Sequence, residues 1–337
     1  MKVCVFGAGS IGCYVGGRLA ASGMPVTLVG RPRVLAEIAQ HGLRVTDWQG
    51  TDWYVDAERL DLAHTPHGAA DADLVLVTVK SRDTDAAAAQ LADVLKPEAV
   101  VISLQNGLHN AERLRQRLPG HVVLAAMVPF NVLSRGRGVF HQGTEGGLDV
   151  QSHPGLTAYL PAFARAGLPV TTHEDMLPVQ WAKLLLNLAN SVNALADLPL
   201  REQLAQRSYR RCVAAAQAEA LDLMDAARIE PARLMAISPR RLVRVLTLPD
   251  VLFRRLARRM LTIDPLARSS MWEDLQAGRP TEVDELNGEV VRLAQRLGRA
   301  APVNARLVEL VHPAESGGRR RWSGPQLLAE LRNDKTG

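Results

Sequence analysis

The sequence contains few cysteines and no long apolar run, and both absences narrow the class of protein. Cys4, Cys13 and Cys212 are the only thiols in 337 residues. Three widely spaced cysteines fit buried thiols in a reducing compartment better than a disulfide framework or a metal site. No segment approaches the roughly 18 uncharged apolar residues that a membrane span needs. Residues 1–3 lead directly into a strand pattern, so we expect no signal peptide and a cytoplasmic protein without a metal centre.

Aromatic residues are also scarce, at 4% of the chain, and none lies among the arginines that supply most of its net charge of +5. These arginines gather as Arg254-Arg255 with Arg258-Arg259 and as Arg319-Arg320-Arg321. Surfaces that bind single-stranded nucleic acid interleave basic and aromatic side chains. We therefore expect a solvated helix face and a basic tail rather than a nucleic-acid interface, and the role of the clusters stays open.

The chain is long enough for about two domains, each with a core of its own. Residues 1–173 alternate strand and helix patterns, which predicts a doubly wound, mainly parallel sheet, an α/β Rossmann domain. Within it, a small hairpin is expected over residues 43–55, and a strand over 138–141 is expected to finish the sheet. From residue 176 onward, helical periodicity takes over. We predict an all-α domain over 174–316 and a basic, loosely held tail over 317–337.

The first strand pattern, Val3 to Phe6, runs straight into the loop Gly7-Ala8-Gly9-Ser10-Ile11-Gly12. In a G-x-G-x-x-G loop the first glycine takes a tight turn and the second lets the backbone approach a pyrophosphate. The third lets the next helix pack on the strand. The N-terminus of that helix adds free N–H donors and a positive dipole end. A strand, a helix and a second strand flank this loop, so we predict a dinucleotide site and keep a merely structural turn as the alternative.

The second strand ends without the acidic residue that an NAD site carries there. That residue, roughly 20 positions after the loop, accepts a hydrogen bond from the ribose 2′-hydroxyl. This chain has Gly30-Arg31-Pro32-Arg33 instead. Two guanidinium groups can bind a 2′-phosphate through paired hydrogen bonds, whereas a carboxylate would repel it. The strand end therefore favours NADP(H), with two solvated surface arginines as the alternative.

Two further strands end on polar residues, at the edge where open α/β sheets bind ligands. Lys80 follows the strand pattern at 73–79, and Asn106 follows the one at 100–104. An amide both donates and accepts, which suits a carboxamide or carboxylate near a nicotinamide. Lys80 fits a surface lysine equally well, and Asn106 fits a left-handed turn before Gly107. Both are candidate cofactor residues with these structural alternatives open.

One apolar helix in the second half carries polar residues at helical spacing. The pattern predicts a single helix over 177–195, and Lys183, Asn187 and either Asn190 or Ser191 recur along one face of it. Polar groups in apolar surroundings need partners, which a polar substrate supplies. An ammonium near a carbonyl can protonate its oxygen as hydride arrives, and burial lowers the lysine pKa toward working pH. The alternative is a lysine whose head reaches solvent, with amides bonded to neighbouring helices.

Together these residues resemble ketopantoate reductase (2-dehydropantoate 2-reductase). The resemblance rests on the order and spacing of several motifs over nearly the whole chain. They are the glycine loop with Arg31, the strand-end Lys80, Asn106-Gly107, the W-x-K-x-x-x-N pattern of Trp181, Lys183 and Asn187, and Ser269-Ser270-Met271 with Glu282 12 residues after Ser270.

The resemblance implies a role for each matching position. Lys183 would donate the proton to the C2 oxygen of ketopantoate, and Glu282 would lie between the cofactor and Lys183. Asn187 and Ser270 would hold the substrate, with the Ser270 hydroxyl near its carboxylate. The glycine loop and the two strand-end residues would bind NADPH. For Glu282 the alternative is a plain helix N-terminal acid, since acids favour that position.

One position departs from the family pattern. Eight residues after the lysine the family usually has a second substrate-binding asparagine, and this chain has Ser191 with Asn190 beside it. Neighbouring helical residues point about 100° apart, so which of the two faces the substrate stays open.

The resemblance implies NADPH-dependent reduction of ketopantoate, in the pathway to pantothenate and coenzyme A, or of another small 2-keto acid. A non-catalytic NADP(H)-binding regulator is the alternative from a different class. The expected partners are the keto acid and the cofactor, without nucleic acid or membrane. The oligomeric state stays open, a homodimer included.

Overall fold

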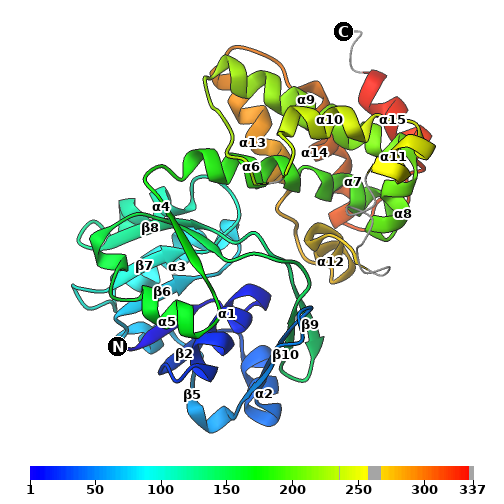
Figure 1. Cartoon of the computed structure of the whole chain (residues 1–337). Coiled ribbons are helices and arrows are strands. Elements are labelled where there is room, and N and C mark those ends of the chain that lie inside the picture. The colour runs from blue at the N-terminus through cyan, green and yellow to red at the C-terminus, as the bar shows by residue number, and fades with distance from the viewer. Residues whose placement is uncertain (235, 257–266, 334–337) are drawn as a thin grey trace. The chain divides into compact units, whose positions relative to one another are not determined.

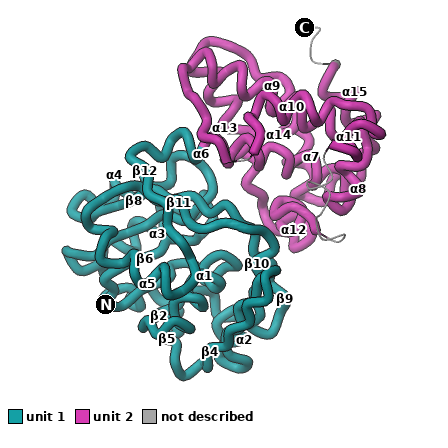
Figure 2. Tube along the Cα trace, in the orientation of Figure 1, with its two compact units in different colours: residues 1–180 teal, residues 181–337 magenta. Residues whose placement is uncertain are grey.

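The computed structural model describes the whole chain except residues 235, 257–266 and 334–337 (Figure 1). The chain divides into two compact units, Met1–Gln180 and Trp181–Gly337 (Figure 2). Unit 1 holds the sheets and unit 2 is almost entirely helical, which confirms the predicted change of fold class along the chain.

Unit 1 is built on an eight-stranded sheet in the order β12-β11-β8-β7-β6-β1-β2-β5. Its strands are β1 (Val3–Phe6), β2 (Val26–Val29), β5 (Leu60–Ala63), β6 (Leu74–Val77), β7 (Val100–Ser103), β8 (Val122–Met127), β11 (Leu148–Gln151) and β12 (Val170–His173). Only β8 and β11 pair antiparallel; the other neighbours are parallel. The four central strands β7, β6, β1 and β2 are buried along their whole length, because apolar side chains cover both faces.

Helices cover both faces of this sheet, as the doubly wound prediction requires. They are α1 (Ser10–Ala21), α2 (Pro32–His41), α3 (Thr84–Ala92), α4 (Asn110–Arg117) and α5 (Leu160–Arg165). Successive strand residues point to opposite faces. Val5 packs into the core that includes α1, α2 and α5, and its neighbour Cys4 packs into the core that includes α3 and α4.

A second, four-stranded sheet lies in unit 1, in the order β4-β3-β10-β9. Its strands are β3 (Leu43–Asp47), β4 (Asp52–Val55), β9 (Val132–Gly136) and β10 (Val139–Gln142). β3 and β4 form the predicted hairpin. The prediction that the strand over 138–141 finishes the main sheet is wrong, because β10 pairs with β3 and β9. An extended pattern locates a strand, but its partner depends on chain packing far away in sequence.

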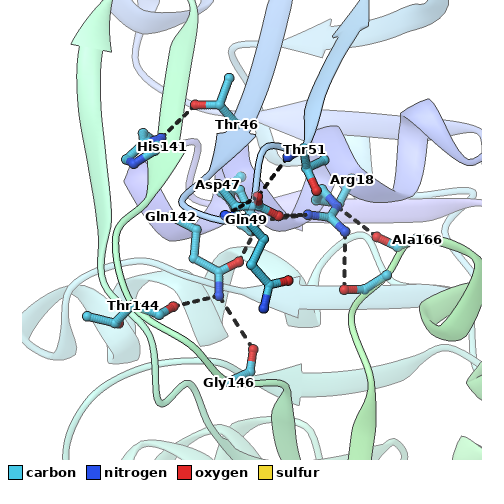
Figure 3. A network of polar contacts seen from close by, with 12 residues as sticks. Arg18, Thr46, Asp47, Gln49, Thr51, His141, Gln142, Thr144, Gly146 and Ala166 are labelled. Atoms are coloured by element: carbon cyan, nitrogen blue, oxygen red, sulfur yellow. Dashed lines mark hydrogen bonds and ion pairs between the residues drawn. The ribbon is translucent and has the colours of Figure 1, made fainter. Parts of the chain in front are cut away.

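Arg18 on α1 joins this second sheet to the main one. Its buried guanidinium donates to the backbone oxygen of Ala166 at 2.8 Å and to the carboxylate of Asp47 at 3.3 Å (Figure 3). It also donates to the Tyr14 hydroxyl at 2.8 Å and lies 4.4 Å from the ring centroid of Trp53. A buried guanidinium with several fixed acceptors holds its surroundings in one arrangement. The network therefore fixes α1, the helix whose N-terminus opens on the glycine loop.

Unit 2 is a cluster of helices. They are α6 (Leu177–Asn187), which begins in unit 1, and α7 (Ala189–Ala196), α8 (Leu200–Ala205), α9 (Arg207–Ala226), α10 (Pro239–Leu246), α11 (Asp250–Leu256), α12 (Ser270–Gln276), α13 (Val283–Arg296), α14 (Pro302–Glu315) and α15 (Gly324–Asn333). No helix in the described ranges is long and apolar enough to cross a membrane. Arg254 and Arg255 lie on α11, whereas Arg258 and Arg259 of the predicted basic helix fall outside the described residues.

The single helix predicted over 177–195 is two helices, α6 and α7, with a break at Leu188. The Gln217 side chain on α9 donates to the Leu185 carbonyl at 2.9 Å, which is the carbonyl that a continuous helix offers to residue 189. The Ser191 hydroxyl also donates to the Leu188 carbonyl at 3.1 Å. Side chains that bond helix carbonyls in this way bend or break helices.

The C-terminal segment also differs from the prediction of a loosely held tail. Its helix α15 packs on α9 and buries Leu327 and Leu331, which share one helix face. Arg306 on α14 pairs with Glu330 on α15 at 2.7 Å. An apolar stripe of two leucines four residues apart is enough to dock the helix, so the chain is held in place as far as Asn333.

Candidate functional site

The glycine loop leaves β1 at the carboxyl end of the main sheet. Gly7 has a φ of +117°, and a Cβ there would come within 2.7 Å of the Val79 backbone nitrogen. A Cβ on Gly12 would come within 2.4 Å of the Gly7 carbonyl oxygen, and the Thr78 hydroxyl donates to that same oxygen at 2.7 Å. The first and third glycines are therefore required by the protein's own packing.

Gly9 is required by no contact of this kind. Its φ of −91° suits any residue, and the nearest atom to a Cβ there would be the Gly7 oxygen, 4.0 Å away. Gly9 is also the N-cap of α1, whose first turn holds no acidic residue. The first N–H groups of a helix have no partner inside it. The open space beside Gly9 and these donors fit a dinucleotide pyrophosphate.

The end of β2 lies against this loop. A Cβ on Gly30 would come within 2.5 Å of the Cβ of Ala8, so the two backbones approach closely. Arg31 and Arg33 follow directly; both side chains are exposed, and neither has a hydrogen bond or ion pair to another described residue. No acidic residue takes the place of Arg31, and the two guanidinium groups can turn toward a ligand phosphate.

The other candidate cofactor residues come to the same edge of the sheet. Lys80 lies after β6 and Asn106 after β7, and both are partly buried. Since β7, β6, β1 and β2 are parallel neighbours, their carboxyl ends meet at one edge. The glycine loop, Arg31, Lys80 and Asn106 thus follow strands whose carboxyl ends share one edge of the sheet, and their binding of a cofactor stays a prediction.

A polar network that the sequence analysis missed holds the loops that follow β6 and β7. The buried Asn110 donates to the Asn106 backbone oxygen at 2.5 Å and to the Ser81 hydroxyl at 2.9 Å. It accepts from the Thr84 hydroxyl at 2.9 Å, and Gln105 donates to that hydroxyl at 2.8 Å. One feature of the sequence could have indicated this network: Asn110, a polar residue, lies four positions after Asn106 and begins α4. The network ties the loop after β6 to the loop after β7.

Lys183 and Asn187 lie on α6, in unit 2. Both are partly buried, and the residues next to Lys183, Ala182 and Leu184, are buried and apolar. Burial lowers the pKa of Lys183 to about 8. An ammonium with a pKa close to working pH can give up its proton, which an ordinary surface lysine does reluctantly.

Asn190 and Ser191 lie on α7, after the helix break, so the predicted single face covers only Lys183 and Asn187. Ser191 is fully buried, and its hydroxyl donates within the helix to the Leu188 carbonyl. Asn190 is partly exposed, and no described residue bonds to its side-chain amide.

Ser270 lies beside Asn190. Ser269, the N-cap of α12, donates from its hydroxyl to the Asn190 backbone oxygen at 3.3 Å. Its backbone N–H donates at 2.9 Å to the amide oxygen of Asn193 on α7. Ser270 is the first residue of α12 and is exposed. The α7–α12 contact therefore brings Asn190 and Ser270 to one place in unit 2.

Glu282 precedes α13 and is 7% exposed. It stands at the N-cap position, yet its side chain makes no capping hydrogen bond. The Thr281 hydroxyl accepts from the Val283 N–H at 3.2 Å, and Glu315 accepts from the Thr281 N–H at 2.7 Å. Burial raises the pKa of the neighbouring Glu285, and the charge of Glu282 adds to this effect. The buried carboxylate of Glu282 is thus not explained by capping α13.

Other features of the described residues do not mark a site. A small apolar pocket in unit 2 is lined by side chains of α6, α9, α10 and the segment before α10. None of the predicted site residues, all of which are described, lines it. No three His, Cys, Asp or Glu side chains of the described ranges gather closely enough to hold a metal ion. All three cysteines are free and buried, and burial raises their pKa.

Comparison with known proteins places this geometry in a family. Residues 3–155 match the family model for ketopantoate reductase PanE/ApbA, and residues 175–315 match the model for its C-terminal part. The 2-dehydropantoate 2-reductase of Halobacterium salinarum is 32% identical over 333 residues, which cover 94% of this chain and 100% of that protein. The enzyme of the same name from Pyrococcus horikoshii is 29% identical over 94% of this chain and 99% of its own.

Solved structures agree. A PanE/ApbA family ketopantoate reductase from Ralstonia eutropha superposes with a TM-score of 0.80 at 32% identity, over 94% of this chain and 99% of that one. D-mandelate dehydrogenase, solved with NADH and anilino(oxo)acetate, has a TM-score of 0.77 over the same shares of the two chains. At 21% identity it shares the fold. From the two family models and the relatives at about 30% identity, this chain belongs to the ketopantoate reductase PanE/ApbA family of oxidoreductases.

Proposed function

We propose that this protein reduces 2-dehydropantoate (ketopantoate) to pantoate with NADPH, a step that supplies pantothenate and coenzyme A. The observation that carries the proposal is Lys183, whose pKa is lowered to about 8 on an otherwise apolar stretch of helix. The two curated relatives compared above both bear the name of this activity.

The residues of unit 1 support NADPH as the cofactor. The backbone N–H groups beside Gly9 would bind the pyrophosphate, and Arg31 with Arg33 would bind the 2′-phosphate. Lys80 and Asn106, at neighbouring strand ends, would hold the nicotinamide half. When bound, the cofactor supplies the hydride that reduces the carbonyl carbon.

The residues of unit 2 would bind the keto acid and deliver the proton. Lys183 would donate from its Nζ to the C2 oxygen as negative charge develops there, and Glu282 would keep the ammonium oriented. Asn187 and Asn190 would donate to the substrate, and the hydroxyl of Ser270 would bind its carboxylate. After transfer the lysine is neutral, a form that its apolar surroundings favour, and solvent then restores its proton.

A different small 2-keto acid is the competing substrate. The same fold serves D-mandelate dehydrogenase, so the fold alone does not choose the acid. The decisive test measures kcat/KM for a panel of 2-keto acids, ketopantoate and aromatic keto acids included, by NADPH absorbance. We expect ketopantoate to give the highest value. A higher value for another acid would replace the substrate and keep the mechanism, and the absence of turnover on every acid would remove the reductase proposal.

The control for this panel is a Lys183→Ala variant with an unchanged Kd for NADPH. Its loss of turnover on the best acid would assign the activity to this site rather than to a contaminating dehydrogenase.

A further inference from the structure

The C-terminal segment continues beyond residue 315, where the family match ends, and it contacts the helices that carry the substrate residues. The Trp322 N–H donates to the Leu195 carbonyl at 2.8 Å, at the end of α7. Tyr209 on α9 donates to the Trp322 carbonyl at 2.7 Å, so α9 holds this segment from its other side. The segment is thus fixed against α7 before α15 begins.

Asp197 is the point where this segment, α7 and α12 meet. It ends α7 in a left-handed conformation with a φ of 53°, and its side chain is 10% exposed. One carboxylate oxygen accepts from Nε of Arg321 at 2.8 Å. The other accepts from Nε1 of Trp272, on α12, at 2.6 Å. A single buried carboxylate therefore links the C-terminal segment to α12.

Charges around Asp197 keep it ionised. Burial by itself raises its pKa, but the hydrogen bonds from Trp272 and Arg321, with the charges of Arg320 and Arg321, outweigh burial and hold the pKa below its usual value. Arg268 lies 3.7 Å from the same carboxylate and stacks 4.1 Å from the Trp272 ring. The ring is therefore held on its face by a cation and at its edge by a carboxylate.

Trp272 is two residues after Ser270 on α12. A shift of its ring moves the first turn of α12, which carries Ser270 at its start. The hydrogen bonds that Ser269 makes to Asn190 and Asn193 hold the same turn against α7. The position of Ser270 relative to Asn190 thus depends on two anchors, and one of them is the Asp197–Trp272 bond.

We propose that Arg321 and Asp197 are positioning residues: by orienting the Asp197 carboxylate on Trp272, the C-terminal segment holds α12 so that Ser270 and Asn190 meet the carboxylate end of the keto acid. This inference rests on the proposed function, since it assumes that these two residues bind substrate. It assigns the basic C-terminal arginines a part in substrate affinity that composition alone does not suggest.

The test compares Arg321→Ala with Arg306→Ala in the full chain. Both arginines hold the C-terminal segment by an ion pair, but Arg306 pairs with Glu330 on α15, away from Asp197. Arg321 is 83% exposed, so its removal leaves the fold intact. We expect Arg321→Ala to raise KM for the keto acid about 2- to 5-fold, with kcat within about 2-fold and Kd for NADPH unchanged. Arg306→Ala should leave KM unchanged, and Arg321→Lys should restore part of the affinity.

Equal KM for Arg321→Ala and the parent protein, or equal increases in both variants, would overturn the proposal. Asp197→Asn provides a second measurement, because it keeps an acceptor for Trp272 in a conformation that asparagine tolerates. It should raise KM less than Asp197→Ala, and the reverse order would also overturn the proposal.

A measurement without substrate separates this inference from the proposed function. In protein labelled with 5-fluorotryptophan, Trp272→Phe assigns the ¹⁹F resonance of Trp272. That resonance should shift in Arg321→Ala and stay in place in Arg306→Ala. If the parent protein reduces no keto acid but this shift occurs, the proposed function is wrong, whereas the link from Arg321 through Asp197 to Trp272 is supported. An unmoved resonance removes the link, whatever the enzyme reduces.

Discussion

The two units present binding groups in different ways. In unit 1 the groups proposed to bind the cofactor are mainly backbone N–H groups of the glycine loop and of α1, and their positions follow from two glycines, Gly7 and Gly12, where a Cβ would meet backbone atoms. In unit 2 the groups proposed to bind the substrate are side chains of Lys183, Asn187 and Asn190, on helices whose positions depend on neighbouring helices. A backbone site can be recognised from a short motif, whereas a side-chain site depends on packing between distant segments.

The largest effect should follow from removing Lys183, the proposed proton donor of unit 2. Lys183→Ala should lower kcat by about 10²- to 10⁴-fold, the usual contribution of a general acid. Kd for NADPH should stay near its parent value, because the phosphate-binding groups lie on unit 1. Steady-state kinetics and a cofactor titration measure both quantities. A variant that folds and keeps most of its turnover would remove Lys183 from the mechanism.

Lys183→Met is the matched control, since it fills similar space without a charge. The pKa of about 8, against an ordinary 10.5, means that the folded state disfavours the ammonium. The variant should lose kcat as Lys183→Ala does, with Kd for NADPH near its parent value, if the ammonium and not the side-chain volume is what the reaction needs. Steady-state kinetics test this, and a Lys183→Met variant that keeps most of its turnover would mean that the volume of the side chain matters and its charge does not.

Gly9 and Gly12 of unit 1 test whether the glycine loop serves ligand binding or only packing. Gly9→Val adds a side chain where the protein leaves room, so we expect normal stability and a rise in KM for NADPH of about 10²-fold, because the valine would occupy the pyrophosphate position. Gly12→Ala should instead lower the free energy of unfolding by about 1–3 kcal/mol, since its Cβ would lie 2.4 Å from a backbone oxygen. Thermal unfolding and NADPH kinetics on both variants distinguish the ligand-facing glycine from the packing glycine.

If Gly9→Val unfolds and Gly12→Ala does not, the division between these glycines is wrong. If both variants bind NADPH normally, the loop is a structural turn.

Arg31 is the one side chain on which the cofactor choice of unit 1 depends most. Arg31→Asp replaces a phosphate partner with a ribose hydroxyl partner. We expect KM for NADPH to rise about 10- to 30-fold, the loss of a charged hydrogen bond, while KM for NADH stays or falls. Equal losses for both cofactors would make Arg31 structural. Arg135→Asp, at an exposed position of β9 in the same unit, is the matched control for a general charge effect.

The pH profile tests unit 2 without a mutation. The lowered pKa of Lys183 means that the donating ammonium predominates below about pH 8 and is lost above it. We expect kcat to be level below pH 8 and then to fall, by about tenfold between pH 7 and 9. The folded protein binds fewer protons at this lysine than the unfolded chain between pH 8 and 10.5, so this group adds stability as pH rises through that window. A flat kcat profile through pH 9 would place the essential proton elsewhere.

How much of this could be predicted from the sequence follows the same division. The sequence places the glycine loop, Arg31, Lys80 and Asn106 at strand ends because each follows a strand pattern, and parallel strands share one edge. Their part in cofactor binding stays a prediction. The strand β10 was assigned to the wrong sheet because pairing with β3 joins residues about a hundred positions apart. An alternating pattern contains no information about its partner.

The helix break at Leu188 shows the same limit in unit 2. No residue near the break is a proline or glycine, and the cause is Gln217, 32 residues away from the carbonyl that it binds. The C-terminal segment was predicted as loose from its Gly, Arg and Ser content, whereas two leucines and the contacts at Asp197 fix it. Local composition does not reveal a partner that folding brings from another part of the chain.

The smallest effect concerns the position where this chain departs from its family. Since the backbone at Leu188 stays helical, spacing alone leaves both Asn190 and Ser191 as candidates, and their contacts distinguish them. The Ser191 hydroxyl donates to the Leu188 carbonyl, whereas Asn190 is partly exposed and its backbone oxygen accepts from Ser269, the residue before Ser270. We therefore expect Asn190→Ala to raise KM for the keto acid about 5-fold, the value of one hydrogen bond, and Ser191→Ala to change it by less than about 2-fold.

Steady-state kinetics on both variants, with NADPH saturating, decides between them. A larger effect from Ser191→Ala would mean that α7 turns its other side to the substrate, and the groups of unit 2 would then have to be placed again around that serine.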